Sequence, residues 1–116
     1  MKKNQLGNVI KKRKKLLVVG GSGYLGRNII KKAISKKWKI VSVSRKRNQN
    51  IIKNPSVENL FFDVSNLKKT SQLKKYKFDY VINTSGYVDH STFSTNGKSI
   101  INNHLISVIN LVSVLN

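Results

Sequence analysis

Short apolar runs alternate along this chain with longer amphipathic segments, which is the pattern of strands joined by helices. The first apolar run is Leu16–Val19, and a glycine-rich turn and an amphipathic segment from Leu25 to about Lys36 follow it. Apolar positions recur there at helical spacing, and basic positions fall on the opposite face. The apolar face consists of Leu25, Ile29, Ile30, Ala33 and Ile34. This stretch therefore predicts a buried strand, a turn and a helix.

Three further apolar runs predict strands, at Lys39–Ser44, Asn59–Asp63 and Phe78–Asn83. Between the last two, Asn66–Lys75 predicts a short helix with Leu67 and Leu73 directed inward. A final helix is expected over Ile100–Leu115, with one apolar face packed on the sheet or against a partner helix. That face holds Ile101, Leu105, Val108, Val112 and Leu115. Alternating strands and helices indicate an α/β fold with a parallel sheet.

The glycine turn has the spacing of a phosphate-binding loop. Gly20 allows a tight turn, Gly23 removes a Cβ that would block a pyrophosphate, and Gly26 lets the helix lie close to its strand. The first turn of the following helix offers free N–H groups to an anion. A plain glycine-rich link between strand and helix is the alternative interpretation.

The run Val18–Gly26 resembles the G-x-x-G-x-x-G cofactor loop of the extended short-chain dehydrogenase/reductases, which include nucleotide-sugar epimerases, dehydratases and reductases. The resemblance continues through Asp63 and Asn83–Gly86, and so covers nearly everything after Lys15. It implies a Rossmann-type, doubly wound parallel sheet with strands in the order 3-2-1-4. It also implies that residues 16–116 form an NAD(P)-binding half-domain.

The end of the second predicted strand bears on the choice between NAD and NADP. An acidic residue roughly 20 positions past the glycine turn binds the ribose 2′-hydroxyl in such folds, whereas a nearby arginine accommodates a 2′-phosphate. The family alignment places Ser44 at the position of the acid, and Arg45 follows it. We therefore expect NADP in preference to NAD. A solvated loop of a lysine-rich protein is the alternative interpretation of Arg45–Arg47.

The resemblance also implies the other cofactor contacts. Asp63 matches the acid that hydrogen-bonds the adenine amino group, and a helix-capping role is its alternative. Asn83, Thr84 and Ser85 match the segment that passes beneath the riboses, with serine where alanine is usual. The expected cofactor-binding residues are thus Gly20, Ser22, Gly23, Tyr24, Leu25, Gly26, Ser44, Arg45, Asp63, Val64, Asn83, Thr84 and Ser85.

The charge of the chain alters this interpretation little. Among 116 residues, 23 Lys and Arg stand against 4 Asp and Glu, for a formal net charge of +19. The lysines are scattered over every polar face, and Asn, Ile and Lys are abundant together, as in proteins encoded by AT-rich genes. Aromatic residues are not interleaved with the basic ones as in single-strand binders. A nucleic-acid-binding domain therefore stays only an alternative.

Other features limit where the protein acts. Residues 1–15 are polar and basic, and we expect a flexible leader there, without the apolar centre of a signal peptide. No apolar run is long enough to span a bilayer, so a cytoplasmic location is expected. The chain has no cysteine, and Asp89 and His90 in a predicted loop are more typical of a surface than of a metal site.

The chemistry of the resembling family depends on a Tyr-x-x-x-Lys pair that this chain does not contain. Its tyrosines are followed four positions later by Asn28, Tyr80, Thr84 and Ser91. We therefore expect no catalytic residue here, and expect the NAD(P)-binding part of a nucleotide-sugar enzyme, with a homodimer through helix 100–115 as a possible assembly. A non-catalytic NAD(P)-binding or redox-sensing protein is the alternative.

Overall fold

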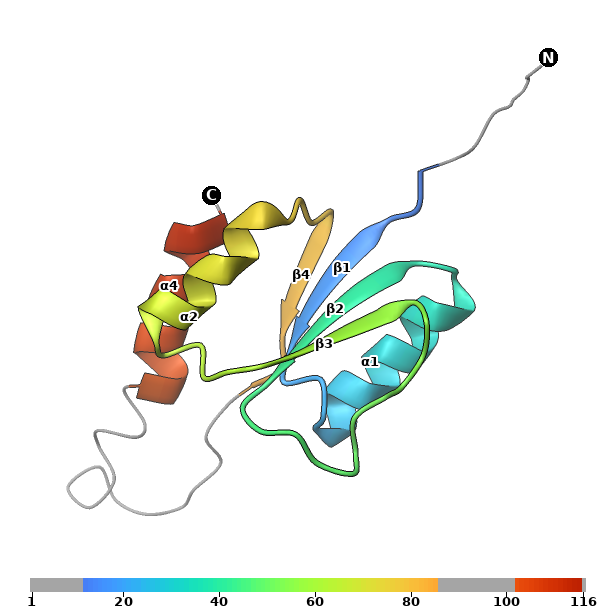
Figure 1. The fold of residues 1–116 in the computed structure, drawn as a ribbon, viewed down its shortest axis with the longest axis horizontal. Helices are drawn as coiled ribbons and strands as arrows, with labels where there is room; N and C mark the ends of the chain where they lie inside the picture. Colours follow the sequence, from blue (N-terminus) through green and yellow to red (C-terminus); the bar gives the residue numbers. More distant parts are fainter. Residues whose placement is uncertain (1–11, 86–101, 116) are drawn as a thin grey trace.

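A four-stranded parallel sheet forms the centre of the computed structural model, which describes residues 12–85 and 102–115. The strands are β1 (Lys15–Val19), β2 (Lys39–Ser44), β3 (Val57–Phe61) and β4 (Tyr80–Asn83). They lie in the order β3-β2-β1-β4 (Figure 1), which confirms the predicted Rossmann-type order 3-2-1-4. All three strand pairs are parallel, so the carboxyl ends meet at one edge.

Helices cover the sheet on both faces (Figure 1). Helix α1 (Tyr24–Ser35) lies on one face. On the other face, α2 (Leu67–Thr70) continues into a 3₁₀-helix at Ser71–Lys75. Beside α2 lies α4 (Ser107–Leu115), which follows a π-helical segment at Asn102–Ile106. The doubly wound arrangement is thus present within the described residues.

Successive residues of β1 and β2 point to opposite faces, and this alternation divides the core in two. Leu16, Val18 and Ile40 pack with Ile30 and Ala33 of α1. The opposite set faces α2 and α4, and consists of Leu17, Val19, Val41, Val43, Phe62, Val64, Leu73, Leu111 and Val114. Both faces of these two strands are buried, so β1 is a continuous apolar run after Lys15, whereas β2 also buries Ser42 and Ser44.

Two strands, β3 and β4, begin about two residues away from the predicted positions. Strand β3 begins and ends about two residues earlier than predicted, because the chain turns away from the sheet at Asp63. Asp63 accepts the backbone N–H of Ser65 at its carboxylate and that of Asn66 at its carbonyl oxygen. Strand β4 begins only at Tyr80, since Asp79 holds the start of β1 by accepting the N–H of Lys15.

Some apolar side chains predicted to point inward do not. Leu67 is 52% exposed and Leu25 is 59% exposed. Both lie in the first turn of their helices. Leu73 is fully buried as expected.

The predicted inward face of the last helix is wrong in its main positions. Leu105, Val108 and Val112 are exposed, whereas α4 turns the opposite side to the sheet. The buried side holds Ser107, Asn110, Leu111 and Val114. The helix is apolar nearly all around, so periodicity alone could not choose the side, and the polar Asn110 goes inward because it finds an acceptor there.

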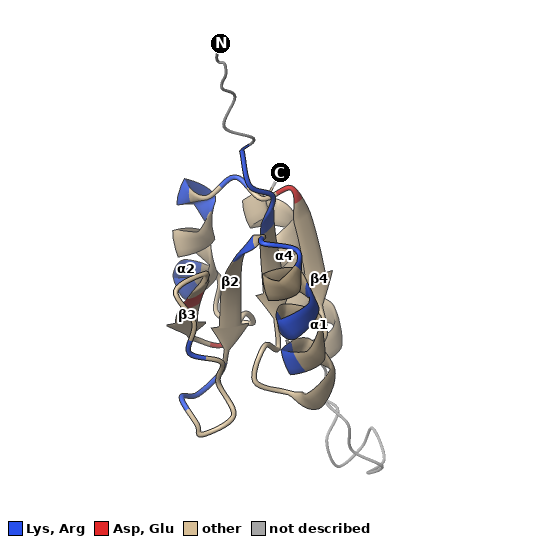
Figure 2. Ribbon diagram, turned by 90° about the vertical axis from the view of Figure 1, so that its right-hand side faces the viewer, with Lys and Arg blue, Asp and Glu red and all other residues tan. Residues whose placement is uncertain are grey.

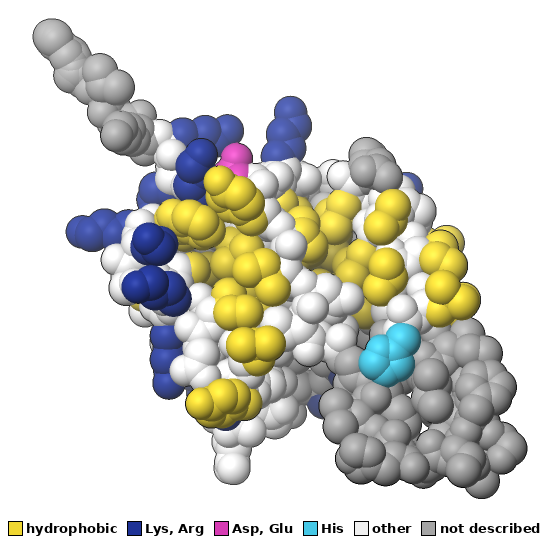
Figure 3. Space-filling model, turned by 180° about the vertical axis from the view of Figure 1, so that it is seen from behind, with side chains coloured by type: hydrophobic (Ala, Val, Ile, Leu, Met, Phe, Trp, Pro, Cys, Tyr) yellow, Lys and Arg dark blue, Asp and Glu magenta, His cyan; other side chains and the backbone are white. Residues whose placement is uncertain are grey.

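Strand β4 leaves an open edge. Among the described residues it pairs only with β1, and Tyr80, Val81 and Ile82 are 49%, 43% and 36% exposed. Figure 3 shows apolar side chains spread over this side of the molecule, across β4 and α4. The edge strand and the outer face of α4 are therefore both uncovered among the described residues.

Candidate functional site

A pocket of about 650 Å³ lies at the carboxyl ends of the strands, beside the glycine turn. In open α/β sheets this is where ligands bind, at the point where the strand order reverses. In the present sheet the reversal lies between β1 and β4. The pocket is lined by Val19, Gly20, Ser22, Gly23, Val43, Ser44, Arg45, Lys46, Asn48, Phe62, Asp63, Val64, Thr84 and Ser85.

The glycine turn is held against the ends of β2 and β4. Gly20 has a φ of +90°, and a Cβ there would lie 2.7 Å from both the backbone nitrogen of Ser85 and the hydroxyl of Thr84. The backbone nitrogen of Gly20 donates to the carbonyl of Val43 at 2.8 Å. Only glycine fits both this conformation and this contact, so the turn is built tightly onto the sheet.

Gly21 is a structural requirement that the spacing of Gly20, Gly23 and Gly26 did not reveal. A Cβ on Gly21 would overlap the hydroxyl oxygen of Ser42 and come within 3.0 Å of Ile30. Ser42 lies in β2, far along the chain from the turn. The contact therefore became apparent only in the folded structure.

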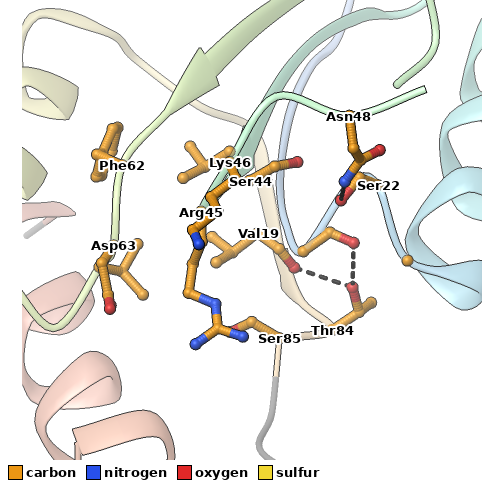
Figure 4. A pocket seen from close by; sticks show the side chains of 14 residues that line it. Val19, Ser22, Ser44, Arg45, Lys46, Asn48, Phe62, Asp63, Thr84 and Ser85 are labelled. Carbon is orange, nitrogen blue, oxygen red and sulfur yellow. Dashed lines mark hydrogen bonds between the residues drawn. The ribbon is translucent and has the colours of Figure 1, made fainter. Parts of the chain in front are cut away.

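Ser44 ends β2 with a buried hydroxyl that has no hydrogen-bond partner in the described part of the chain. The residue is 4% exposed and lines the pocket. Arg45 follows it and extends from the strand end into the pocket, with Lys46 beside it (Figure 4). A buried hydroxyl without a partner is costly unless a ligand supplies one. The strand end thus offers one unused hydroxyl and two cations to the pocket.

Asp63 projects from the segment that follows β3, between the buried side chains of Phe62 and Val64. Its carboxylate accepts the N–H of Ser65 at 2.9 Å. It does not cap helix α2, because Asn66 is the N-cap there and accepts the N–H of Lys69 at 3.0 Å. The capping alternative is therefore ruled out for α2, and Asp63 lines the pocket while it shapes its own turn.

Thr84 locks the end of β4 to the end of β1. Its hydroxyl lies 2.9 Å from the carbonyl of Val19 and 3.2 Å from that of Gly20. Its backbone nitrogen also donates to Val19, at 2.8 Å. Ser85 then turns back, since its nitrogen and hydroxyl both donate to the Asn83 side chain. Small side chains thus form the pocket wall next to the glycine turn (Figure 4).

Most of the predicted cofactor residues come together in this pocket, and four do not line it. Tyr24, Leu25, Gly26 and Asn83 lie outside the lining, and Gly26 is buried against Gly20 of the turn. Sequence reasoning did not include five lining residues, Val19, Val43, Lys46, Asn48 and Phe62. Of these, Lys46 continues the cationic run after Ser44 and could have been found. Gly86, Asp89 and His90 lie outside the described residues.

Asn48 was not foreseeable from the glycine motif. Its side-chain amide lies 3.4 Å from the hydroxyl of Ser22, and so joins the loop after β2 to the glycine turn (Figure 4). The two residues are 26 positions apart. Only folding places them together.

These features fit a dinucleotide. Gly23 begins α1 with extended backbone and no side-chain cap, so the first N–H groups of the helix stay available to an anion. A Cβ on Gly23 would contact nothing closer than 3.4 Å, since its Cα faces the open pocket. The hydroxyl of Ser44 and the cations of Arg45 and Lys46 complete a polar, positively charged lining.

Charged residues outside the pocket are distributed widely. Figure 2 shows Lys and Arg on α1, on α2, on the chain before β1 and on the loop after β2. Within the predicted leader, Arg13 donates to the carbonyls of Lys37 and Trp38 and to the hydroxyl of Ser56.

In the part of the chain that is described, no three His, Cys, Asp or Glu side chains gather as a metal site. No helix in the same part is both long and apolar enough to cross a membrane.

Comparison with known families supports the same interpretation of the turn and the sheet. The model of the NAD dependent epimerase/dehydratase family matches residues 16–116. The match begins at the second residue of β1 and includes the glycine turn, the ends of β2 and β4 that line the pocket, and α4.

Solved structures share the fold at low sequence identity. The Bordetella bronchiseptica enzyme WbmH, solved with NAD⁺, has a TM-score of 0.76 at 16% identity over 89% of this chain and 35% of its own. A UDP-glucose 4-epimerase has a TM-score of 0.74 at 16% identity, over 87% of this chain and 31% of its own. Uronate dehydrogenase from Agrobacterium tumefaciens has a TM-score of 0.68 at 18% identity, over 88% of this chain and 36% of its own. The chain thus spans about a third of the length of these proteins.

Proposed function

Because this chain belongs to the NAD dependent epimerase/dehydratase family, we propose that it forms the NAD(P)-binding portion of an enzyme acting on a nucleotide sugar. The observation that carries the proposal is the pocket at the switch point of the sheet, where the glycine turn, Ser44–Arg45 and Asp63 meet. The similar WbmH enzyme was solved with NAD⁺, and another similar structure is that of a UDP-glucose 4-epimerase.

Each part of the pocket then has a role. The pyrophosphate lies over Gly23 at the start of α1, where a side chain would obstruct it. Ser44 contacts the adenosine ribose, and the carboxylate of Asp63 accepts a hydrogen bond from the adenine amino group. Thr84 and Ser85 pass beneath the cofactor as small residues. Residues 16–116 act as the cofactor half-domain, and a nicotinamide cofactor bound there supplies hydride transfer.

We further propose that NADP binds more tightly than NAD. At the end of β2 no carboxylate occupies the position of Ser44, so nothing there repels a 2′-phosphate. Arg45 and Lys46 both line the pocket and would attract it. One arginine paired with the phosphate is worth on the order of 1–3 kcal/mol, roughly five-fold to a hundred-fold in affinity.

Titration of the chain with NADP and NAD, followed by thermal unfolding, tests both statements. A dinucleotide at about a hundred times its Kd should raise the melting temperature by on the order of 10 °C. Absence of any shift would contradict the proposed function, and equal shifts would contradict only the NADP preference. Strongly salt-dependent DNA binding without a shift would favour a nucleic-acid-binding domain instead.

The uncovered outer face of α4 supports a homodimer through this helix. Leu105, Val108, Ile109 and Val112 are between 43% and 55% exposed. An apolar helix face of this kind is typical of an interface rather than of a solvated surface. A non-catalytic NAD(P)-binding or redox-sensing protein is the alternative function that would share this pocket.

A further inference from the structure

Two side chains from different helices approach the backbone carbonyl of Val64. The Nδ2 atom of Asn110, in α4, donates to it at 2.9 Å. The hydroxyl of Thr70, in α2, lies 3.1 Å from the same oxygen. Asn110 is 7% exposed and Thr70 is fully buried, so both groups lie in the core. Buried polar groups of this kind depend on such hydrogen bonds, because bulk water does not reach them.

The two donors are not equivalent. The hydroxyl of Thr70 also lies 2.8 Å from the carbonyl of Asn66, and a hydroxyl has only one hydrogen to donate. Because the shorter distance is to Asn66, Thr70 serves mainly the backbone of its own helix. The amide of Asn110 is therefore the principal donor to Val64.

The bond from Asn110 fixes the segment that presents Asp63 to the pocket. Phe62 and Val64, on either side of Asp63, are 4% and 5% exposed and pack in one cluster with α4. On one side the nitrogen of Phe62 donates to the carbonyl of Ser44 at 2.9 Å. On the other side Asn110 holds the carbonyl of Val64. The backbone of Asp63 is thus tied at both ends, once to β2 and once to α4.

We propose that Asn110 is a positioning residue for adenine recognition, acting through Val64 on Asp63. The inference rests on the proposed function, in which the Asp63 carboxylate accepts a hydrogen bond from adenine. Asn110 is not among the residues that line the pocket, so its effect on the ligand is indirect. A shift of the Val64 carbonyl would move the neighbouring Asp63. Because hydrogen bonds weaken steeply when their geometry changes, this movement would weaken the bond between the Asp63 carboxylate and adenine.

The test compares NADP with deamino-NADP, in which hypoxanthine replaces adenine and a carbonyl oxygen replaces the amino group. The full chain should bind NADP about ten-fold or more tightly, because one hydrogen bond to a charged acceptor is at stake. Asn110→Leu removes the donor with little change in shape. We expect the preference to fall below about three-fold, with weaker NADP binding and nearly unchanged deamino-NADP binding.

Two further variants separate positioning from stability. Val114→Ala removes buried carbon atoms from the same helix and the same cluster, yet leaves the bond to Val64 intact. It should lower the melting temperature and keep the preference for adenine. Asn110→Ala also removes the donor and serves if Asn110→Leu does not fold. The alanine variant leaves space for a water molecule that can hydrate the carbonyl of Val64.

The outcomes distinguish the two levels of the proposal. If folded variants of Asn110 keep the ten-fold preference, or Val114→Ala loses it as fully, the role of Asn110 is wrong and the proposed function stands. If the unmodified chain binds both dinucleotides equally, Asp63 does not recognise adenine and the inference fails with it. If the unmodified chain binds neither, the proposed function fails as well.

Discussion

A Cβ on Gly26 would fall on the carbonyl oxygen of Gly20, so α1 can approach the end of β1 this closely only with glycine at position 26. Gly23 lies in the same turn and meets the same oxygen at an ordinary 3.4 Å. One glycine is thus required for packing, whereas the other leaves space on the side of the pocket. The two can be separated by mutation.

Gly26→Ala should destabilise the fold, and Gly23→Val should abolish dinucleotide binding without unfolding the chain. The first change forces a methyl group onto backbone atoms, which costs typically 1–3 kcal/mol or more. Gly23 has φ −77° and ψ 169°, an extended conformation that valine adopts readily. Chemical denaturation monitored by circular dichroism, together with NADP titration, gives both readouts. A folded Gly23→Val variant that binds with undiminished affinity would show that no pyrophosphate lies there.

The double variant Ser44→Asp/Arg45→Ala should reverse the cofactor preference from NADP to NAD. The new carboxylate repels a 2′-phosphate and can accept from a ribose hydroxyl, while the main cation is removed. We expect NADP affinity to fall by roughly five-fold to a hundred-fold. Lys39→Ala is the matched control, because Lys39 is an exposed cation at the opposite end of the same strand. A comparable loss in the control would indicate a general charge effect.

The phenol of Tyr76 should make stability fall in alkaline solution. Partial burial, a hydrogen bond donated to Glu58 at 2.7 Å and the charge of Glu58 raise the pKa of Tyr76 to about 12. In the unfolded chain a tyrosine ionises near 10. The raised pKa therefore adds stability that is fully present below pH 10 and is lost as the pH rises toward 12.

Tyr76→Phe isolates this effect from that of the other tyrosines and the lysines. The difference in unfolding free energy between the unmodified chain and Tyr76→Phe should be constant below pH 10 and shrink above it. Glu58→Gln should bring the pKa of Tyr76 in the folded chain closer to its value in the unfolded chain, because it removes the negative charge while keeping an acceptor. The stability that Tyr76 adds should then be lost over a narrower range of pH. A difference that does not change between pH 9 and pH 12 would contradict the shifted pKa.

The uncovered edge of β4 and the outer face of α4 should make the chain self-associate as salt is added. Exposed apolar side chains favour contact, whereas a net charge of +19 opposes it until counterions screen the repulsion. Sedimentation velocity at low and high NaCl measures this balance. Val108→Ser/Val112→Ser should reduce association if α4 is the interface. Unchanged association in that variant would direct attention to β4.

The sequence was sufficient to predict the features that depend on local pattern. Strand β2 has the predicted bounds, the strand order is as expected, and the glycine spacing locates the pocket at the end of β1. Alternation, helical periodicity and the steric freedom of glycine are properties of neighbouring residues, so they can be recognised before folding. Ser44, Arg45 and Asp63 were located by resemblance at strand ends, and all three line the pocket.

Only the tertiary structure decided which side of α4 is buried and which polar groups find partners. The helix is apolar nearly all around, and its orientation follows from Asn110 reaching the carbonyl of Val64, 46 residues earlier. The overlap of a Cβ on Gly21 with Ser42, and the unpartnered hydroxyl of Ser44, likewise arise between segments that are distant in sequence. Such contacts depend on distances between packed elements, and the order of residues along the chain does not encode those distances locally.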